Sequence, residues 1–121
     1  MAKGLVIYTD GTYELKEFKQ LQDYCNIVDG YIEGIKMYSI GTNSQSGYAY
    51  INEEGKLQGL TRNRDASLVA WLSHAIYDSD TIAGNMIIMG AGDDEGNDTD
   101  VAQIWVDLVQ HFCLPRKATN V

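Results

Sequence analysis

Basic residues are scarce in this chain, and four of them fall in its middle part. Arg62 and Arg64 are two of the three arginines, and with Lys36 and Lys56 they are the only bases between residues 20 and 115. A guanidinium group binds phosphate through two parallel hydrogen bonds, and lysine adds a compact positive charge. In a chain with a formal net charge of −8, this grouping predicts a small site for an anion such as a nucleotide phosphate.

Amide and aromatic side chains nearby could complete such a site. Asn52 and Asn63 could donate amide hydrogen bonds, and Tyr31, Tyr48 or Tyr50 could stack on a nucleobase. The predicted ligand-binding residues are Arg62, Arg64, Asn63, Asn52, Lys56, Tyr31, Tyr50 and Lys36. The alternative is a solvated basic turn in which the arginines pair with nearby carboxylates.

Signatures of catalysis and of metal binding are missing from the sequence. It has no Gly-x-Ser-x-Gly, His-Glu-x-x-His or phosphate-loop motif. His74 could act as a general base only if the fold brings a carboxylate and a reactive group to it. The acidic segment 93–100 offers oxygen ligands, but Ala91 stands where a calcium loop with Gly96 at its sixth position needs a carboxylate. We therefore expect no catalytic residue, no metal and no cofactor.

Acidic residues are concentrated in the second half of the chain. Residues 1–64 carry a net charge of about −1, whereas residues 65–121 carry about −7. Direct nucleic-acid binding needs a positive surface to neutralise phosphates, so we expect none here. The excess of carboxylates either maintains solubility or presents a negative surface to a basic partner.

The composition is that of one globular domain. The chain has 121 residues, 45% of them hydrophobic, which is enough to form a core without disulfides or metals. Cys25 and Cys113 are isolated, so we expect buried, reduced thiols. No apolar run approaches the ~20 residues of a membrane span, and we expect a cytoplasmic protein that contacts no membrane. We expect a single domain over residues 1–114 and a flexible tail over 115–121.

Hydrophobic periodicity predicts an α+β fold with a mostly antiparallel sheet and about three helices. The predicted strands cover residues 5–8, 12–18, 31–38, 48–52, 56–58 and 86–89, and the predicted helices cover 21–28, 66–77 and 101–112. Asp10-Gly11 favours a type I′ hairpin turn. Asp65 and Asp100 are the expected N-caps of the second and third helices, with Gln103 completing a capping box.

Several short segments resemble a known family. Gly30-Tyr31-Ile32-Glu33, the hairpin Asn52–Leu57 with Gly59-Leu60 and Asn63, and the apolar run Gly84–Gly90 are similar to the domain of unknown function 3846 family. These are small proteins of phages, plasmids and bacteria, and the resemblance covers roughly residues 4–112. Thr61 departs from the pattern, because the family usually has proline there. The resemblance implies no enzymatic activity, but it implies company with mobile elements and antirestriction genes.

Three functional hypotheses follow. The first is a non-enzymatic phage-type protein that binds and sequesters a small nucleotide signal of host defence, with the site formed between subunits of a homo-oligomer. The second is an acidic inhibitor that occupies the nucleic-acid-binding surface of a host protein. The third is a nucleotide-degrading enzyme that uses His74 or a carboxylate as its base.

Overall fold

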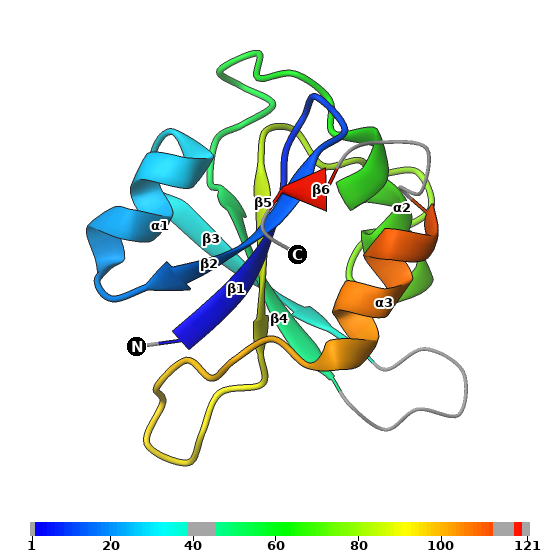
Figure 1. The fold of residues 1–121 in the computed structure, drawn as a ribbon. Coiled ribbons are helices and arrows are strands. Elements are labelled where there is room, and N and C mark those ends of the chain that lie inside the picture. Colours follow the sequence, from blue (N-terminus) through cyan, green and yellow to red (C-terminus); the bar gives the residue numbers. More distant parts are fainter. Residues whose placement is uncertain (1, 39–45, 113–117, 120–121) are drawn as a thin grey trace.

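One six-stranded sheet forms the centre of the protein (Figure 1). The computed structural model describes residues 2–38, 46–112 and 118–119. In chain order the elements are β1 (Ala2–Ile7), β2 (Tyr13–Phe18), α1 (Leu21–Val28), β3 (Ile32–Met37), β4 (Gly47–Asn52), α2 (Arg64–Leu72), β5 (Met86–Gly90), α3 (Gln103–Phe112) and β6 (Ala118–Thr119). The spatial order is β3-β4-β5-β1-β2-β6, and every neighbouring pair is antiparallel except β2 with β6. The predicted α+β class is therefore confirmed.

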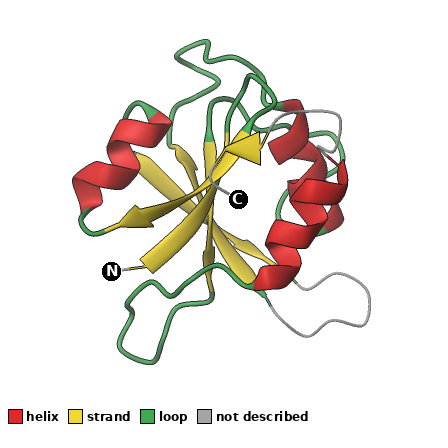
Figure 2. Cartoon of the chain, viewed as in Figure 1, coloured by secondary structure: helices red, strands yellow, loops and turns green. Residues whose placement is uncertain are grey.

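The helices cover both faces of this sheet. Helix α1 packs on one face, and α2 and α3 pack on the other (Figures 1 and 2). Because successive strand residues point to opposite faces, Leu5 and Ile7 join the core under α2 and α3, while Val6 joins the core under α1. Strand β5 is buried along its whole length, which explains why its sequence is continuously apolar rather than alternating.

The first hairpin forms where the sequence predicts it, but the turn is different. A type I′ turn needs positive φ at both central residues, and only Gly11 has it, at φ 89°. The amide of Tyr8 donates to the carbonyl oxygen of Thr12 at 2.9 Å, and the amide of Gly11 donates to the carbonyl oxygen of Tyr8 at 3.2 Å. The connection is thus a three-residue loop that ends in a left-handed glycine, and the type I′ prediction is wrong.

Two of the predicted helix caps are also wrong. Asn63 caps α2 in place of Asp65, because its side chain accepts from the amide of Ala66. Helix α2 ends at Leu72, short of the predicted residue 77. Asp100 caps no helix, since its Oδ1 atom accepts from the amide of Lys3 at 2.7 Å. Its carboxylate instead attaches the acidic segment 93–100, called the acidic loop below, to the start of β1.

One further segment differs from the expectations. The predicted strand over 56–58 is absent, since residues 53–59 form turns and Leu57 is exposed. In the predicted tail, Ala118 and Thr119 pair with β2 as β6. Cys25 is a half-buried free thiol, and Cys113 lies outside the described residues. No helix within the described ranges is long and apolar enough to cross a membrane.

Candidate functional site

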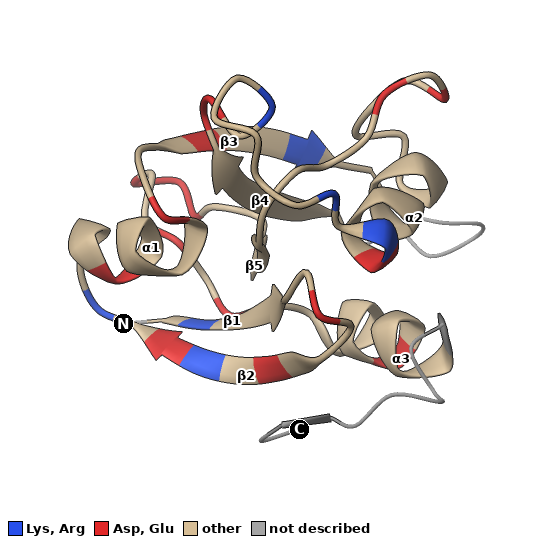
Figure 3. Cartoon of the chain, turned by 90° about the horizontal axis from the view of Figure 1, so that it is seen from above, with Lys and Arg blue, Asp and Glu red and all other residues tan. Residues whose placement is uncertain are grey.

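The structure distributes the eight predicted ligand residues over several places. Lysine and arginine occupy few positions of the described chain, spread over several strands, turns and the start of α2, whereas aspartate and glutamate occupy more positions (Figure 3). Arg62 and Arg64 are both exposed, and neither lines a described cavity. The Arg64 Nη1 atom lies 3.7 Å from Oδ1 of Asp65, whose carboxylate is buried while the arginine side chain is exposed.

Asn63 has a structural role between these two arginines. Only 1% of it is exposed. Its Nδ2 atom donates to the carbonyl oxygens of Ile7 at 2.9 Å and Gly84 at 3.0 Å, and its Oδ1 atom accepts from the amide of Ala66 at 3.0 Å. One side chain therefore caps α2 and also joins the ends of β1 and the segment before β5.

Asn52 performs a similar role at the end of β4. Its Nδ2 atom donates to the carbonyl oxygens of Val28 at 3.0 Å and Asp29 at 3.1 Å, and its Oδ1 atom accepts from the amide of Glu54 at 2.7 Å. The side chain thus fixes the C-terminus of α1 against the turn that follows β4. Its donor and acceptor groups are already occupied within the fold.

The remaining predicted residues lie apart from one another. Tyr31 is 78% exposed beside α1. The Lys36 ammonium sits 5.2 Å from the centre of the Tyr38 ring, and Tyr50 points to Asp98 on the face covered by α1. Lys56 lies in an ion pair with Asp80.

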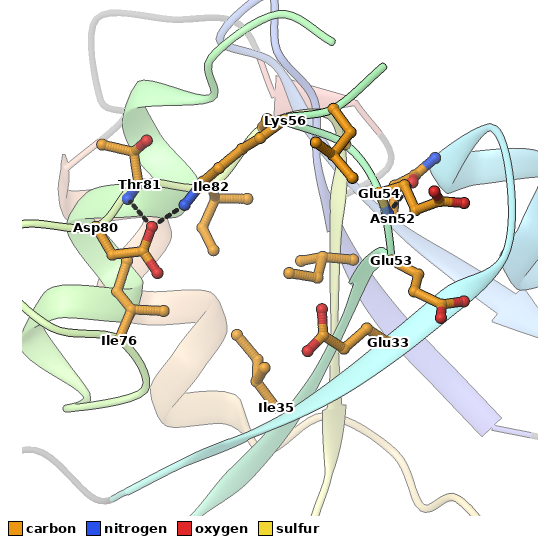
Figure 4. Close-up of a pocket in the computed structure, with 14 residues that line it drawn as sticks. Glu33, Ile35, Asn52, Glu53, Glu54, Lys56, Ile76, Asp80, Thr81 and Ile82 are labelled. Carbon is orange, nitrogen blue, oxygen red and sulfur yellow. Dashed lines mark hydrogen bonds and ion pairs between the residues drawn. The ribbon is translucent and has the colours of Figure 1, made fainter. Parts of the chain in front are cut away.

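The cavity that contains Lys56 is the strongest candidate site. Its volume is about 420 Å³, and we call it the acidic cleft (Figure 4). It lies between the β3–β4 surface, the turn after β4 and the segment that follows α2. The lining residues are Glu33, Ile35, Ile51, Asn52, Glu53, Glu54, Gly55, Lys56, Leu57, Ile76, Asp80, Thr81, Ile82 and Ala83.

Four isoleucines give this cleft apolar walls, and its lining includes four carboxylates and one ammonium. The Lys56 ammonium contacts Asp80, Glu33 points into the cleft, and the Glu53 and Glu54 carboxylates lie at its rim (Figure 4). The acidic side chains belong to Glu33, Glu53, Glu54 and Asp80. Within the described residues, the carboxylates of the three glutamates have neither a hydrogen-bond donor nor an ion-pair partner. The local charge is therefore strongly negative, and an added cation would meet unpaired carboxylates beside apolar surface.

Local backbone structure positions the two charged walls. Asp80 Oδ1 accepts from the amide of Thr81 at 2.8 Å, and the indole of Trp71 on α2 donates to the Asp80 carbonyl oxygen at 2.7 Å. On the opposite wall, a Cβ atom at Gly55 would lie 2.8 Å from the carbonyl oxygen of Ala83. Only glycine lets the turn approach that segment so closely, and this approach brings Lys56 within reach of Asp80.

A second cavity of about 500 Å³ opens on the face of α1. The hydroxyl groups of Tyr24 and Tyr50 donate to the two oxygens of Asp98, each at 2.7 Å. Phe18 stacks on Tyr24, with ring centres 4.6 Å apart. Burial, followed by the hydrogen bond to Asp98, raises the pKa of both tyrosines. The carboxylate and both hydroxyl groups satisfy one another, so this cluster attaches the acidic loop to the sheet.

Among the described residues, no three His, Cys, Asp or Glu side chains are grouped so that they could hold a metal ion. His74 follows α2 with a left-handed φ of 58° and is exposed. The sequence offered one signal for the acidic cleft: Glu33 lies in β3, and Glu53 and Glu54 directly follow β4, the strand that pairs with it.

The chain folds as a small α+β protein with an acidic cleft beside the β3–β4 surface. Over residues 2–112 the chain matches the family described as Domain of unknown function (DUF3846), and it belongs to that family. The resemblance seen in the sequence is thereby confirmed. Comparisons with curated proteins and with solved structures find no match.

Proposed function

We propose that this protein is a non-enzymatic binding protein that receives a basic segment of a partner protein in its acidic cleft. The observation that carries the proposal is the combination of four carboxylates with walls of Ile35, Ile51, Ile76 and Ile82. Lysine and arginine side chains have an apolar stem and a charged head, so they fit a surface of this kind better than either an apolar or a purely polar ligand does.

The Lys56–Asp80 pair supports the same proposal from inside the molecule. Lys56 already places an ammonium against Asp80 in this cleft, and a ligand cation would compete with it for that carboxylate. Replacing the lysine should therefore strengthen the binding of a basic ligand. Tighter binding would distinguish competition from a structural role, because the loss of a structural ion pair is expected to weaken an adjacent site.

The setting suggested by the family resemblance is a phage or another mobile element. A basic protein segment that a phage protein could block is the nucleic-acid-binding surface of a host protein. Occupying that surface needs no catalysis, which agrees with a site made of binding groups. Charge attraction would speed the encounter and make it sensitive to salt.

A labelled peptide tests the proposal. The probe is a fluorescein-tagged segment of about eight residues in which lysine and valine alternate, a length typical of one strand. Fluorescence anisotropy gives its dissociation constant at low and at raised salt. We expect Glu33→Gln with Glu53→Gln to weaken binding about three- to tenfold, from two exposed ion pairs. Asp94→Asn with Glu95→Gln changes the net charge equally outside the cleft and should change the affinity far less.

Two results would contradict the proposal. Equal losses in the two double variants would mean that the peptide responds to net charge alone and not to the cleft. Weaker binding by Lys56→Gln, where we expect binding about threefold tighter, would mean that the lysine supports the site and does not compete for it.

Nucleotide sequestration is the second candidate function. Arg62 and Arg64 flank the buried, extended Asn63, and alternate residues of an extended segment point to the same side. Both arginines are exposed, and a second copy of the chain would have to supply the opposite wall of such a site. Thermal shift against a nucleotide panel tests this, since a real ligand adds about 2.7 kcal/mol at a hundredfold excess over its dissociation constant. Loss of the shift in Arg62→Ala with Arg64→Ala would support it.

A further inference from the structure

Strand β3 has an open outer edge, and its register shows which residues face outward. Among the described strands it pairs with β4 alone, and Ile32 lies opposite Asn52. One step back, the amide of Glu53 donates to the carbonyl oxygen of Tyr31 at 2.9 Å. In an antiparallel pair, hydrogen-bonded residues alternate with residues whose amide and carbonyl groups point away. Ile32, Gly34 and Lys36 therefore direct their backbone groups away from β4.

The end of the strand confirms this assignment. Tyr38 continues the outward-facing series, and its amide donates to the carbonyl oxygen of Ser73 at 2.9 Å. The C-terminus of α2 thus closes the edge at Tyr38. Gly34 and Lys36 are exposed, and within the described ranges nothing pairs with their amide and carbonyl groups, which form an open row along β3 at the margin of the sheet. Figure 3 shows the position of this strand.

This open edge adjoins the acidic cleft. Glu33 and Ile35, which alternate with the outward-facing residues, line the cleft on the face of α2 and α3. A chain laid along β3 would place every second side chain beside these two residues and Ile76. Its backbone would meet the unpaired row, while its side chains would meet apolar walls and unpaired carboxylates.

We infer that the partner segment binds as an added strand on β3, with alternate basic or apolar side chains entering the acidic cleft. This inference rests on the proposed function and adds the mode of binding to it. Strand addition supplies affinity through backbone hydrogen bonds and selectivity through alternate side chains. It predicts a ligand that is extended and that alternates in sequence, rather than a helix or a folded basic surface.

Charge complementarity selects this occupant over a second copy of the chain. A β3–β3 pair would bring together two chains that each carry a formal charge of −8, with Glu33 of each copy near the other copy's cleft. Natural sheet edges use charged residues to resist such pairing. A lysine-rich segment reverses the sign of that interaction and gains from every carboxylate of the cleft.

Two backbone-methylated peptides provide the test. One carries N-methyl groups at the odd residues of the lysine–valine probe, and the other carries them at the even residues. A strand added to β3 directs only one of these two sets toward the edge. We expect one methylated peptide to bind about tenfold more weakly or worse, from the loss of two or more hydrogen bonds, and the other to bind nearly as the parent does.

A protein variant tests the same edge from the other side. Lys36→Pro removes an outward amide without removing a bond to β4, and proline is tolerated at such positions. The variant should bind the parent peptide about threefold more weakly, or worse, than Lys36→Gln does. The glutamine variant is the matched control because it removes the same charge but keeps the backbone amide.

The outcomes separate the two proposals. If the parent peptide binds and both methylated peptides bind equally well, strand addition is refuted while the acidic cleft stands as a binding site. If the parent peptide does not bind at low salt, the proposed function itself fails. A dimer of the unliganded chain in sedimentation that the parent peptide does not dissociate would also overturn the inference, because the edge would then belong to a second copy.

Discussion

Replacing Asn63 by alanine should destabilise the protein strongly, although the two residues beside it are exposed. The side chain makes three hydrogen bonds within the fold, at 2.9 to 3.0 Å, and only 1% of it is accessible. Removing the N-cap costs about 1 kcal/mol. Leaving the carbonyl oxygens of Ile7 and Gly84 without this donor adds about 1 kcal/mol each at the lower end of the usual range.

The expected loss for Asn63→Ala is therefore about 3 kcal/mol, a large part of the 5–15 kcal/mol that usually stabilises a domain. Urea unfolding followed by circular dichroism measures it directly. Asn63→Ser keeps a capping oxygen but cannot reach both carbonyl groups as a donor, so we expect an intermediate loss of about 2 kcal/mol. Arg62→Ala and Arg64→Ala are matched neighbours on the exposed side, and each should stay within about 0.5 kcal/mol.

A free energy of unfolding for Asn63→Ala within about 1 kcal/mol of that of the unchanged chain would contradict this structural role of Asn63. That result would mean that the amide does not join β1, α2 and the segment before β5. Asn63 would then be available as a ligand residue, as the sequence alone suggested. A loss of nucleotide binding without a loss of stability would strengthen that conclusion.

Three other substitutions test separate parts of the fold. Burial and the hydrogen bond to Asp98 raise the pKa of Tyr50, so the associated stability is complete below about pH 10 and is lost as the pH rises above it; Asp98→Asn should flatten this decline in urea unfolding between pH 9 and pH 11, and an unchanged slope would contradict the assignment. Gly90→Ala should destabilise the chain by about 1–3 kcal/mol, because an added Cβ would overlap the carbonyl oxygen of Asp100; an unchanged melting temperature would show that the acidic loop does not pack against β5. His74→Val should cost about 1–2 kcal/mol more than His74→Gly, because φ is 58° there and a β-branched residue resists that conformation; equal stabilities of the two variants would argue against a left-handed residue.

Much of the fold could be predicted from local patterns. The continuous apolar run Met86–Met89 predicts a strand that is covered on both faces of its sheet. The structure agrees, because β5 lies inside the sheet and is buried along its length. The 3.6-residue periodicity of 21–28 predicts α1 within its observed bounds. These elements can be predicted because the spacing of apolar residues along the chain indicates both the type of element and which of its faces is buried.

Hydrogen-bond partners distant in the chain decided what the local patterns could not. Asp100 has the residue type and spacing of a helix cap, yet it accepts from Lys3, which is 97 positions away. The same holds for Asn52, which lies beside basic and aromatic residues in the sequence but bonds to the end of α1. The sequence alone does not distinguish a polar side chain that binds a ligand from one that forms hydrogen bonds within the fold, because the difference depends on its neighbours in space.

The sequence by itself determined the fold class, the family and the absence of recognisable catalytic motifs, because these follow from composition, periodicity and short motifs. The tertiary structure alone decided which charges share a surface. Pairing of β3 with β4 brought Glu33 opposite Ile51, and the turn at Gly55 brought Lys56 to Asp80 across 24 residues of sequence. Electrostatic and apolar contacts act over a few ångströms of space, and only the folded chain sets which residues lie within that range.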